Sequence, residues 1–201
     1  MIKKLNNTEL GKAGTHDTYI LIPNDLDIRD IFENENTPIE FKDKNTGEKI
    51  KIRNTVGREK RVVGLGQYYR SKDLVAGDEI ILESHISSKG IEHFVSVNKN
   101  FENLVIQNSK YGFEILTPEK RKDFVKKASE IKADVSIKYL QSKKKRNDSP
   151  DTTDFYDVLI SGVSIKDKYR SKDIVEIRIE DDEVIDTEFY GWKKYIFEVE
   201  E

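Results

Sequence analysis

The chain has 201 residues, of which 36% are hydrophobic and 36% are charged, so it is polar for a globular protein but long enough to bury one or two cores. It contains no cysteine, which excludes disulfides, thiolate metal sites and cysteine nucleophiles and suits a reducing, cytoplasmic location. The N-terminus lacks an apolar signal segment, and no later run approaches the roughly 20 apolar residues of a membrane span. We therefore expect a protein that is neither secreted nor embedded in a membrane.

The formal net charge of -3 hides an uneven distribution of charge along the chain. Residues 42–72 contain ten Lys and Arg residues against three acidic residues, a net charge of +7. The acidic residues gather instead in residues 25–40 and 176–188. A near-neutral total can therefore coexist with a basic face of the kind that binds phosphate.

Residues 18–23 form a short β-rich run that ends at Pro23, which predicts a strand. Residues 25–32 place four apolar side chains near helical spacing, which predicts a short helix. Residues 38–54 contain two alternating stretches joined by 45–47, where Gly47 supplies a turn. This pattern predicts a hairpin, with apolar side chains facing the core and cations facing outward: Ile39, Phe41, Ile50 and Ile52 inward, and Lys42, Lys49, Lys51 and Arg53 outward.

Further strands are predicted at 78–83 and 92–97, each after a glycine, in the rhythm of a barrel or sandwich. At Thr117 the pattern changes. Threonine as N-cap, Pro118 at the first helical position and Glu119 in the first turn predict a helix with an apolar stripe of Phe124, Val125, Ala128 and Ile131. Residues 143–153 predict an exposed loop, and strands are expected near 156–160, 174–179 and 195–199.

We place a domain boundary between residues 108 and 109, which gives a first domain at 1–108 and a C-terminal extension of mixed helices and strands at 109–201. One internal echo crosses this boundary, because residues 69–75 nearly repeat at 169–175. The flanking residues do not match, so the echo does not establish a duplicated domain.

The run at residues 4–23 resembles the opening of the EcoRII N-terminal domain family of restriction endonucleases, in its Lys-Leu, its glycines, His16 and the strand that closes in Ile-Pro. A second similarity runs from Gly57 through residues 67–70 to a Val-x-Gly-Asp segment at 75–78. The resemblance covers residues 1 to about 108. It implies a mainly β chain with short helices (α+β), in which a DNA-binding pseudobarrel like that of plant B3 domains precedes a smaller mixed α/β region.

The resemblance also implies two arms that enter the major groove of double-stranded DNA: residues 11–19 and residues 53–61. Arginine can bond guanine edges in two places, a carboxylate can accept from a cytosine amine, and lysine can neutralise phosphate. The DNA-binding residues that we expect are Thr15, His16, Asp17, Tyr19, Arg53, Asn54, Arg58, Glu59, Lys60, Arg61 and Arg70. Glu59 is the informative member, because an arm that gripped only phosphate would gain nothing from a carboxylate.

The sequence shows no catalytic constellation. Glu40-Phe41-Lys42 fits half of a nuclease motif but has no upstream Pro-Asp partner, and Pro150-Asp151 has no Asp/Glu-x-Lys after it. The three histidines lack zinc spacing, no Gly-rich loop ends in Gly-Lys-Ser/Thr, and the acidic run 180–183 is typical of a solvated turn. We expect no catalytic residue, metal site or cofactor.

The leading hypothesis is therefore sequence-specific recognition of double-stranded DNA, as the recognition module of a bacterial restriction-modification system. A nuclease or motor subunit or domain would then supply the rest of a type II restriction endonuclease. One alternative is a small Mg²⁺-dependent nuclease whose ligands lie in 109–201, among Asp151, Asp154, Asp157 and Glu176. The other is a protein-interaction module whose basic helix at 120–138 meets an acidic partner.

Overall fold

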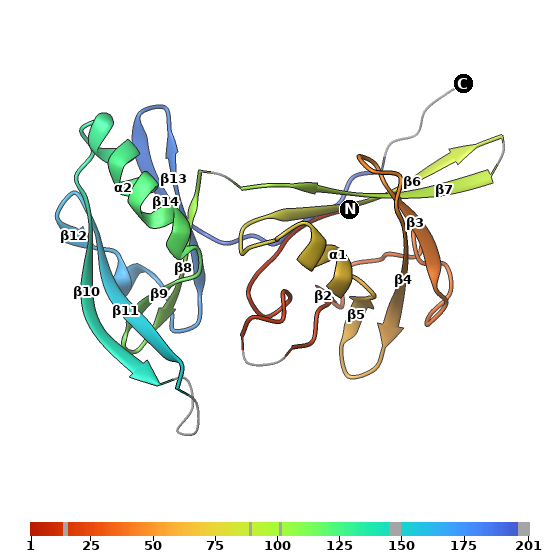
Figure 1. Ribbon diagram of the computed structural model, residues 1–201, viewed down its shortest axis with the longest axis horizontal. Helices are drawn as coiled ribbons and strands as arrows, with labels where there is room; N and C mark the ends of the chain where they lie inside the picture. The colour runs from red at the N-terminus through yellow and green to blue at the C-terminus, as the bar shows by residue number, and fades with distance from the viewer. Residues whose placement is uncertain (14–15, 89, 101, 145–149, 197–201) are drawn as a thin grey trace. The chain divides into compact units, whose positions relative to one another are not determined.

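The computed structural model of the chain describes residues 1–13, 16–88, 90–100, 102–144 and 150–196 (Figure 1). They form two compact units. Unit 1 comprises Met1–Lys99 together with the chain from Gly191 onward, and unit 2 comprises Asn100–Tyr190. Unit 2 is therefore inserted, along the sequence, between two parts of unit 1. In the described part of the chain, no helix has the length and apolar character needed to span a membrane.

Unit 1 is built on one sheet whose strands are mostly antiparallel neighbours. Within its described residues the strands are β1 (Ile2–Lys4), β2 (Ile20–Ile22), β3 (Ile39–Asp43), β4 (Lys49–Val56), β5 (Lys60–Val63), β6 (Glu79–Ser87), β7 (Gly90–Asn98) and β15 (Trp192–Lys193). They lie in the order β15-β1-β6-β7-β3-β4-β5-β2, and β3 and β7 run parallel. A short helix, α1 (Gly66–Ser71), follows β5.

The two end strands of this sheet approach each other. The indole N–H of Trp192 on β15 donates a hydrogen bond to the carbonyl oxygen of Leu21 on β2 at 3.1 Å. The bond joins strands that would otherwise be exposed edges, so the sheet curls into an incompletely closed barrel (Figure 1). The expected architecture, a mainly β pseudobarrel with short helices, is confirmed.

The hairpin of β3 and β4 follows the predicted alternation. Phe41 and Ile52 are fully buried, and Ile39 and Ile50 pack against the same core. Gly47 lies in the turn with φ of +72°, a left-handed conformation that glycine adopts without the steric cost of a side chain. Period-two patterning therefore identified both the hairpin and its buried face.

The predicted helix at residues 25–32 is wrong. The segment forms consecutive turns, with a single helical bond from the Phe32 N–H to the Ile28 carbonyl. The Asp27 carboxylate accepts from the Arg29 backbone N–H, and such local bonds compete with helix formation. Ile28, Ile31 and Phe32 are nevertheless buried. The apolar spacing therefore identified buried side chains correctly, although they do not lie on a helix.

Unit 2 contains a second sheet covered by one longer helix. Its described strands are β8 (Leu104–Ser109), β9 (Gly112–Ile115), β10 (Val135–Lys144), β11 (Thr152–Ile160), β12 (Val163–Ser164), β13 (Ile174–Glu180) and β14 (Glu183–Glu188). They lie in the order β10-β11-β9-β8-β13-β14, with β12 paired to β11. The helical segments are η1 (Pro118–Lys120), α2 (Arg121–Glu130) and η2 (Lys166–Lys168).

The predicted helix after Thr117 is present, but Thr117 does not cap it. The segment begins with the 3-10 turn η1 and continues as α2, whose Phe124 and Ala128 are buried. The Thr117 hydroxyl instead accepts a hydrogen bond from the Val105 N–H at 3.0 Å. Because the threonine is fully buried, its hydroxyl satisfies a strand N–H in the core rather than a helix N–H.

Three features of the C-terminal half differ from the sequence-based expectations. The boundary at 108/109 falls at the end of β8, inside unit 2. The expected 143–153 loop is shorter, because β10 continues to Lys144, and residues 145–149 lie outside the described part. The C-terminal strand is β15. Tyr195 and Ile196 are not in a strand, and residues 197–199 of the strand predicted at 195–199 lie outside the described part.

The two echo segments share one turn but belong to different elements. In each, the aspartate N–H donates to the carbonyl of the arginine three residues earlier, at 3.1 Å. Residues 69–75 include the end of α1, and the left-handed residue there is Asp73, with φ of +47°. Residues 169–175 follow η2 and lead into β13, and the left-handed residue there is Lys172, with φ of +82°.

Candidate functional site

The first expected arm is the connection between β1 and β2 in unit 1. His16 and Asp17 are exposed, whereas Tyr19, which leads into β2, is 8% exposed. Thr15 lies outside the described residues. The arm therefore presents Lys12, His16 and Asp17 to solvent and ends on an aromatic ring that is packed against the protein.

Glu9 anchors the end of this arm and was not singled out by the sequence. Its backbone carbonyl accepts from the Tyr19 N–H at 3.1 Å, and its Oε1 accepts from the Leu21 N–H at 3.1 Å. Its carboxylate also forms an ion pair with Lys3 at 3.1 Å, in which both side chains are buried. Burial raises the pKa of the Glu9 carboxyl in spite of the nearby ammonium group. A buried pair that also bonds two backbone groups fixes where the arm re-enters the sheet.

The second expected arm is the hairpin of β4 and β5, with residues 57–59 at its turn. Arg58 and Glu59 are exposed at this turn, and Arg53 is exposed on β4. Lys60 is half-buried, and its Nζ donates to the Asn24 carbonyl at 3.4 Å. The hairpin therefore presents a guanidinium and a carboxylate side by side at its exposed end.

The two arms meet through β2 and β5, which pair antiparallel with Leu21 opposite Arg61. The Arg61 guanidinium lies over the Tyr19 ring, 4.1 Å from its centroid. Glu59 accepts from Arg61 Nη2 at 2.7 Å and from Nε at 3.0 Å, and this carboxylate raises the pKa of Arg61. An arginine held on two sides in this way is preorganised, so less side-chain freedom is lost when it binds a ligand.

The strand register sets which side chains share a face with Arg61. Thr55 and Leu21 lie directly opposite Arg61, and Arg53 lies opposite Val63. Because directly opposed residues and every second residue along a strand share a face, Tyr19, Arg53 and Arg61 belong to one outward face of β2, β5 and β4. We call this outward face, together with the 57–59 turn, the arm face.

Asn54 lies on the opposite side of β4. It is 6% exposed and stands opposite Val62, which belongs to the core. Among the described residues, its Oδ1 has no hydrogen-bond partner. The structure therefore brings Asn54 to the back of the arm face rather than onto it.

Arg70 is exposed on α1, close to the first arm. A Cβ added to Gly66 would stand 2.5 Å from Thr18 Oγ1 and 3.5 Å from Arg70 Nη1. A side chain at residue 66 would therefore push the arm away from α1. The glycine lets Arg70 lie beside Thr18, at the border of the arm face.

The basic stretch 42–72 is less positive in the fold than in the sequence. Lys42, Lys44 and Lys49 form ion pairs with Glu92, Glu83 and Glu40, at 2.6–2.8 Å. Lys72 pairs with the buried Asp43 at 2.8 Å. These pairs offset charge on the β3–β4 hairpin and near α1. The excess of positive charge is therefore carried mainly by the arm residues.

The carboxylates considered as nuclease ligands are not gathered. Asp154 accepts from Ser142 and Asp157 accepts from Ser164, both at 2.6 Å, and alternation along β11 places these two aspartates on opposite faces. The buried Glu176 accepts from the Asn103 amide at 2.6 Å. A search of the described residues finds no group of three or more His, Asp or Glu side chains suited to hold a metal ion.

Comparison with known proteins gives likeness to solved structures but no match by sequence. No protein-family profile matches the chain. No curated protein sequence matches it either. Among solved structures, the chain is similar to one described as an Arabidopsis FUS3-DNA complex, with 16% identity and a TM-score of 0.35. The match covers 49% of this chain and 95% of that one.

Proposed function

We propose that this chain binds double-stranded DNA at a specific short sequence through the arm face of unit 1. The observation that carries the proposal is the Arg61 guanidinium, which is stacked on Tyr19 of one arm and bonded to Glu59 of the other. Arg53 and Arg58 lie exposed on the same arm. This grouping combines the arginine donors that read guanine edges with a carboxylate that accepts from a cytosine amine.

The resemblance of residues 1 to about 108 to the EcoRII N-terminal domain family, from which the two arms were taken, also assigns DNA contacts to them. His16 and Asp17 of the first arm, Lys60 next to the hairpin turn and Arg70 at the border of the face would contact phosphate or base edges. Phosphate contacts would position the protein on the duplex, and the guanidinium and carboxylate groups would select the sequence.

Alanine substitution of the two arginines tests this assignment. In Arg58→Ala and Arg61→Ala, we expect binding to the preferred duplex to weaken by about 1 to 3 kcal/mol and selectivity to relax at one base pair. Arg61→Lys should keep most non-specific binding but lose discrimination, because lysine lacks the planar fork that bonds two acceptors at once. Fluorescence anisotropy with duplexes mutated at single positions measures both effects.

Arg29→Ala is the matched control, since Arg29 is an exposed arginine of unit 1 that pairs with Asp27 outside the arms. It removes the same charge and should leave selectivity unchanged. If the arm variants weaken binding equally on every sequence, Arg58 and Arg61 contact phosphate only. If they bind like the wild type, the arm face is not the interface.

We further propose that the chain serves as the recognition part of a restriction-modification system and that cleavage is performed by another subunit or domain. The scattered carboxylates of unit 2 support this division. Incubating the pure chain with supercoiled plasmid and Mg²⁺ should leave the plasmid intact even at large protein excess. Nicking or linearisation that persists through further purification would contradict the division.

A further inference from the structure

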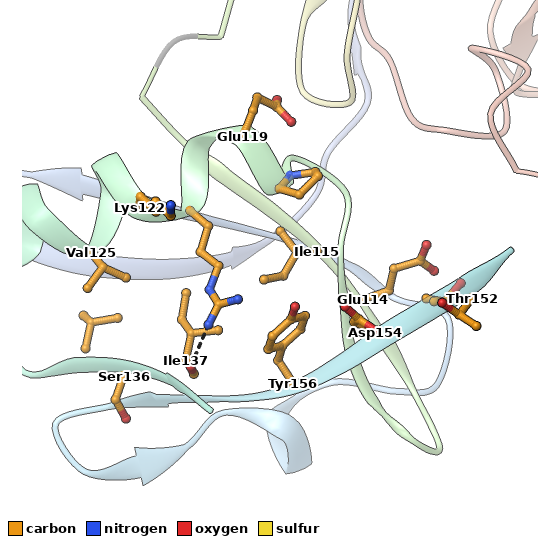
Figure 2. Close-up of a pocket in the computed structure, with 14 residues that line it drawn as sticks. Glu114, Ile115, Glu119, Lys122, Val125, Ser136, Ile137, Thr152, Asp154 and Tyr156 are labelled. Atoms are coloured by element: carbon orange, nitrogen blue, oxygen red, sulfur yellow. Dashed lines mark hydrogen bonds between the residues drawn. The ribbon is translucent and has the colours of Figure 1, made fainter. Parts of the chain in front are cut away.

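Unit 2 contains a cavity that the arm face does not use. It has a volume of about 1030 Å³ and lies between η1 and α2 on one side and β9, β10 and β11 on the other (Figure 2). Its size is that of sites that enclose a small organic molecule. All of its lining residues belong to unit 2, whereas both arms belong to unit 1.

A flat cationic surface forms part of the cavity wall. The Arg121 guanidinium at the start of α2 lies over the Tyr156 ring of β11, 4.4 Å from the ring centroid. Arg121 Nη2 donates to the Ile137 carbonyl at 3.2 Å, which holds the guanidinium in place, and the Tyr139 ring meets Tyr156 edge-on at 6.0 Å. Guanidinium planes and aromatic rings are the surfaces on which nucleobases stack.

The lining also carries both signs of charge. Arg121 and Lys122 contribute cations from α2, whereas Glu114 of β9, Glu119 of η1 and Asp154 of β11 contribute carboxylates. In Figure 2, Glu114 and Asp154 lie toward one end of the cavity, next to Thr152 and beyond the Tyr156 ring. A fitting ligand therefore combines a planar ring, a negative group and hydrogen-bond donors.

We propose that this cavity binds a nucleobase together with its 5′-phosphate. The base would lie against the Arg121–Tyr156 stack, the phosphate would face Lys122, and an exocyclic amine of the base would donate to Glu114 or Asp154. The same chemistry is offered by a free nucleotide and by a base turned out of a duplex. The proposal concerns unit 2 alone and does not depend on DNA binding by the arms.

Titration of the full chain with nucleotides tests the site. We expect saturable binding of dAMP, dCMP and dGMP, and binding on the order of tenfold weaker for deoxyribose 5-phosphate, which has no base to stack. dTMP, which lacks an exocyclic amine, should bind more weakly than the other three. Isothermal calorimetry measures all five ligands under one condition. Equal affinity for deoxyribose 5-phosphate would overturn the proposal in favour of simple phosphate binding.

Three variants connect the binding to the cavity. Arg121→Gln removes the stacked guanidinium and should weaken every nucleotide. Glu114→Gln keeps the size of the side chain but removes an acceptor charge, so it should reduce binding of the amine-bearing nucleotides toward the level of dTMP while dTMP stays unchanged. Lys126→Gln, on the exposed side of α2 where Lys126 faces Glu130, is the matched control. Asp154→Asn makes the same change at the other carboxylate. Unchanged selectivity in both Glu114→Gln and Asp154→Asn would overturn the assigned orientation.

A second experiment distinguishes a base presented by DNA from the base of a free nucleotide. A duplex with one unpaired nucleotide is compared with the fully paired duplex of the same sequence, in the wild type and in Arg121→Gln. Preference for the unpaired duplex that disappears in Arg121→Gln identifies a base presented by DNA. Binding of free nucleotides without that preference identifies a small-molecule site. Absence of both overturns the proposal, whatever the arms bind.

Discussion

Arg61 has three neighbours of different chemistry: the Tyr19 ring, the Glu59 carboxylate and Thr55 on the paired strand. The ring and the carboxylate hold the guanidinium in one orientation, so its remaining N–H groups have defined directions. A substitution at this residue therefore changes geometry as well as charge. For this reason the lysine variant is more informative than the alanine variant.

Asp43 is the residue whose charge contributes most clearly to the stability of unit 1. It is 1% exposed and accepts hydrogen bonds from the Tyr68 hydroxyl, the Lys72 ammonium and the backbone N–H groups of Asn45 and Thr46, at 2.6–2.8 Å. Burial alone would raise the pKa of Asp43, but these bonds outweigh burial and hold the pKa well below its usual range. Burial raises the pKa of the Tyr68 hydroxyl, and its hydrogen bond to Asp43 raises that pKa further.

Asp43→Asn should therefore lower the free energy of unfolding at neutral pH by about 2 kcal/mol, because Lys72 loses its partner. The carboxylate pKa is lower in the folded state, so its contribution is complete above the unfolded value of about 3.9 and is lost as the pH falls toward the folded value. Urea unfolding at a series of pH values should show a constant gap between wild type and variant above about pH 5, narrowing below about pH 4.

Glu92→Gln is the control for Asp43→Asn. Glu92 forms an exposed ion pair with Lys42, which lies next to Asp43 on β3. Exposed pairs contribute little, so this variant should unfold close to the wild type. A gap for Asp43→Asn that stays constant down to pH 3 would contradict the proposed role of its charge.

Individual residues were predictable where a local pattern determined them. The alternation in residues 38–54 identified Phe41 and Ile52 as buried, and the turn glycine was found by its position between two strands. The same alternation places Asn54 on the inward side of β4, two residues after Ile52, although it was expected to contact DNA. Glu9 and Thr117 could not be placed in this way, because each bonds a strand N–H twelve residues away and no local signal marks a polar residue that the fold will bury.

Among the elements, β15 is only two residues long but connects both ends of the sheet of unit 1. It is the strand Trp192–Lys193, pairs with β1, and carries the indole that bonds Leu21 of β2. β2 in turn pairs with β5 of the second arm. The C-terminal segment thus supports the strand on which both arms depend.

Trp192→Phe should keep the aromatic packing but remove the N–H donor to Leu21, so we expect unfolding to become easier by about 1 kcal/mol. Because the lost bond lies at the end of the sheet, the substitution should increase the rate of hydrogen exchange more in β2 than in the central strands. Tyr190→Phe, at an exposed aromatic position, serves as the control. Unchanged exchange in β2 would show that the bond does not hold the sheet together.

Two physical causes separate the sequence-based predictions from these elements. β1 and β15 are too short for a periodic pattern, and each is formed by pairing with strands distant in the sequence: β15 with β1, and β1 with both β15 and β6. Residues 25–32 have helical spacing but form turns, and there the Asp27 carboxylate competes for a backbone N–H. Tertiary pairing in the first case and local polar competition in the second decide the structure.

At the scale of the whole molecule, unit 2 is an insertion within unit 1 rather than a C-terminal extension of it. The chain leaves unit 1 after Lys99 and returns at Gly191, and the returning segment supplies β15. A fragment that ends at residue 108 would therefore lack Trp192 and the bond between the end strands. Experiments on the arms accordingly need the full chain.

The distribution of charge over the surface is also a property of the whole fold. The net charge of -3 would keep the chain away from nucleic acid if it were spread evenly, but ion pairs neutralise much of the β3–β4 hairpin and leave arginines on the arm face. The sequence located the basic stretch. It could not show which cations are paired, because their partners on β6 and β7 lie in other segments.

The central claim is that the arm face selects one short sequence in double-stranded DNA. Repeated selection of bound molecules from a pool of random duplexes, with the full-length wild-type chain and with the Arg58→Ala, Arg61→Ala double variant, tests it most directly. We expect the wild type to enrich a single short motif containing at least one guanine, and the double variant to lose preference at one or two positions of that motif. Retained DNA binding with no enriched motif in the wild type, or an identical motif in both proteins, would contradict the claim.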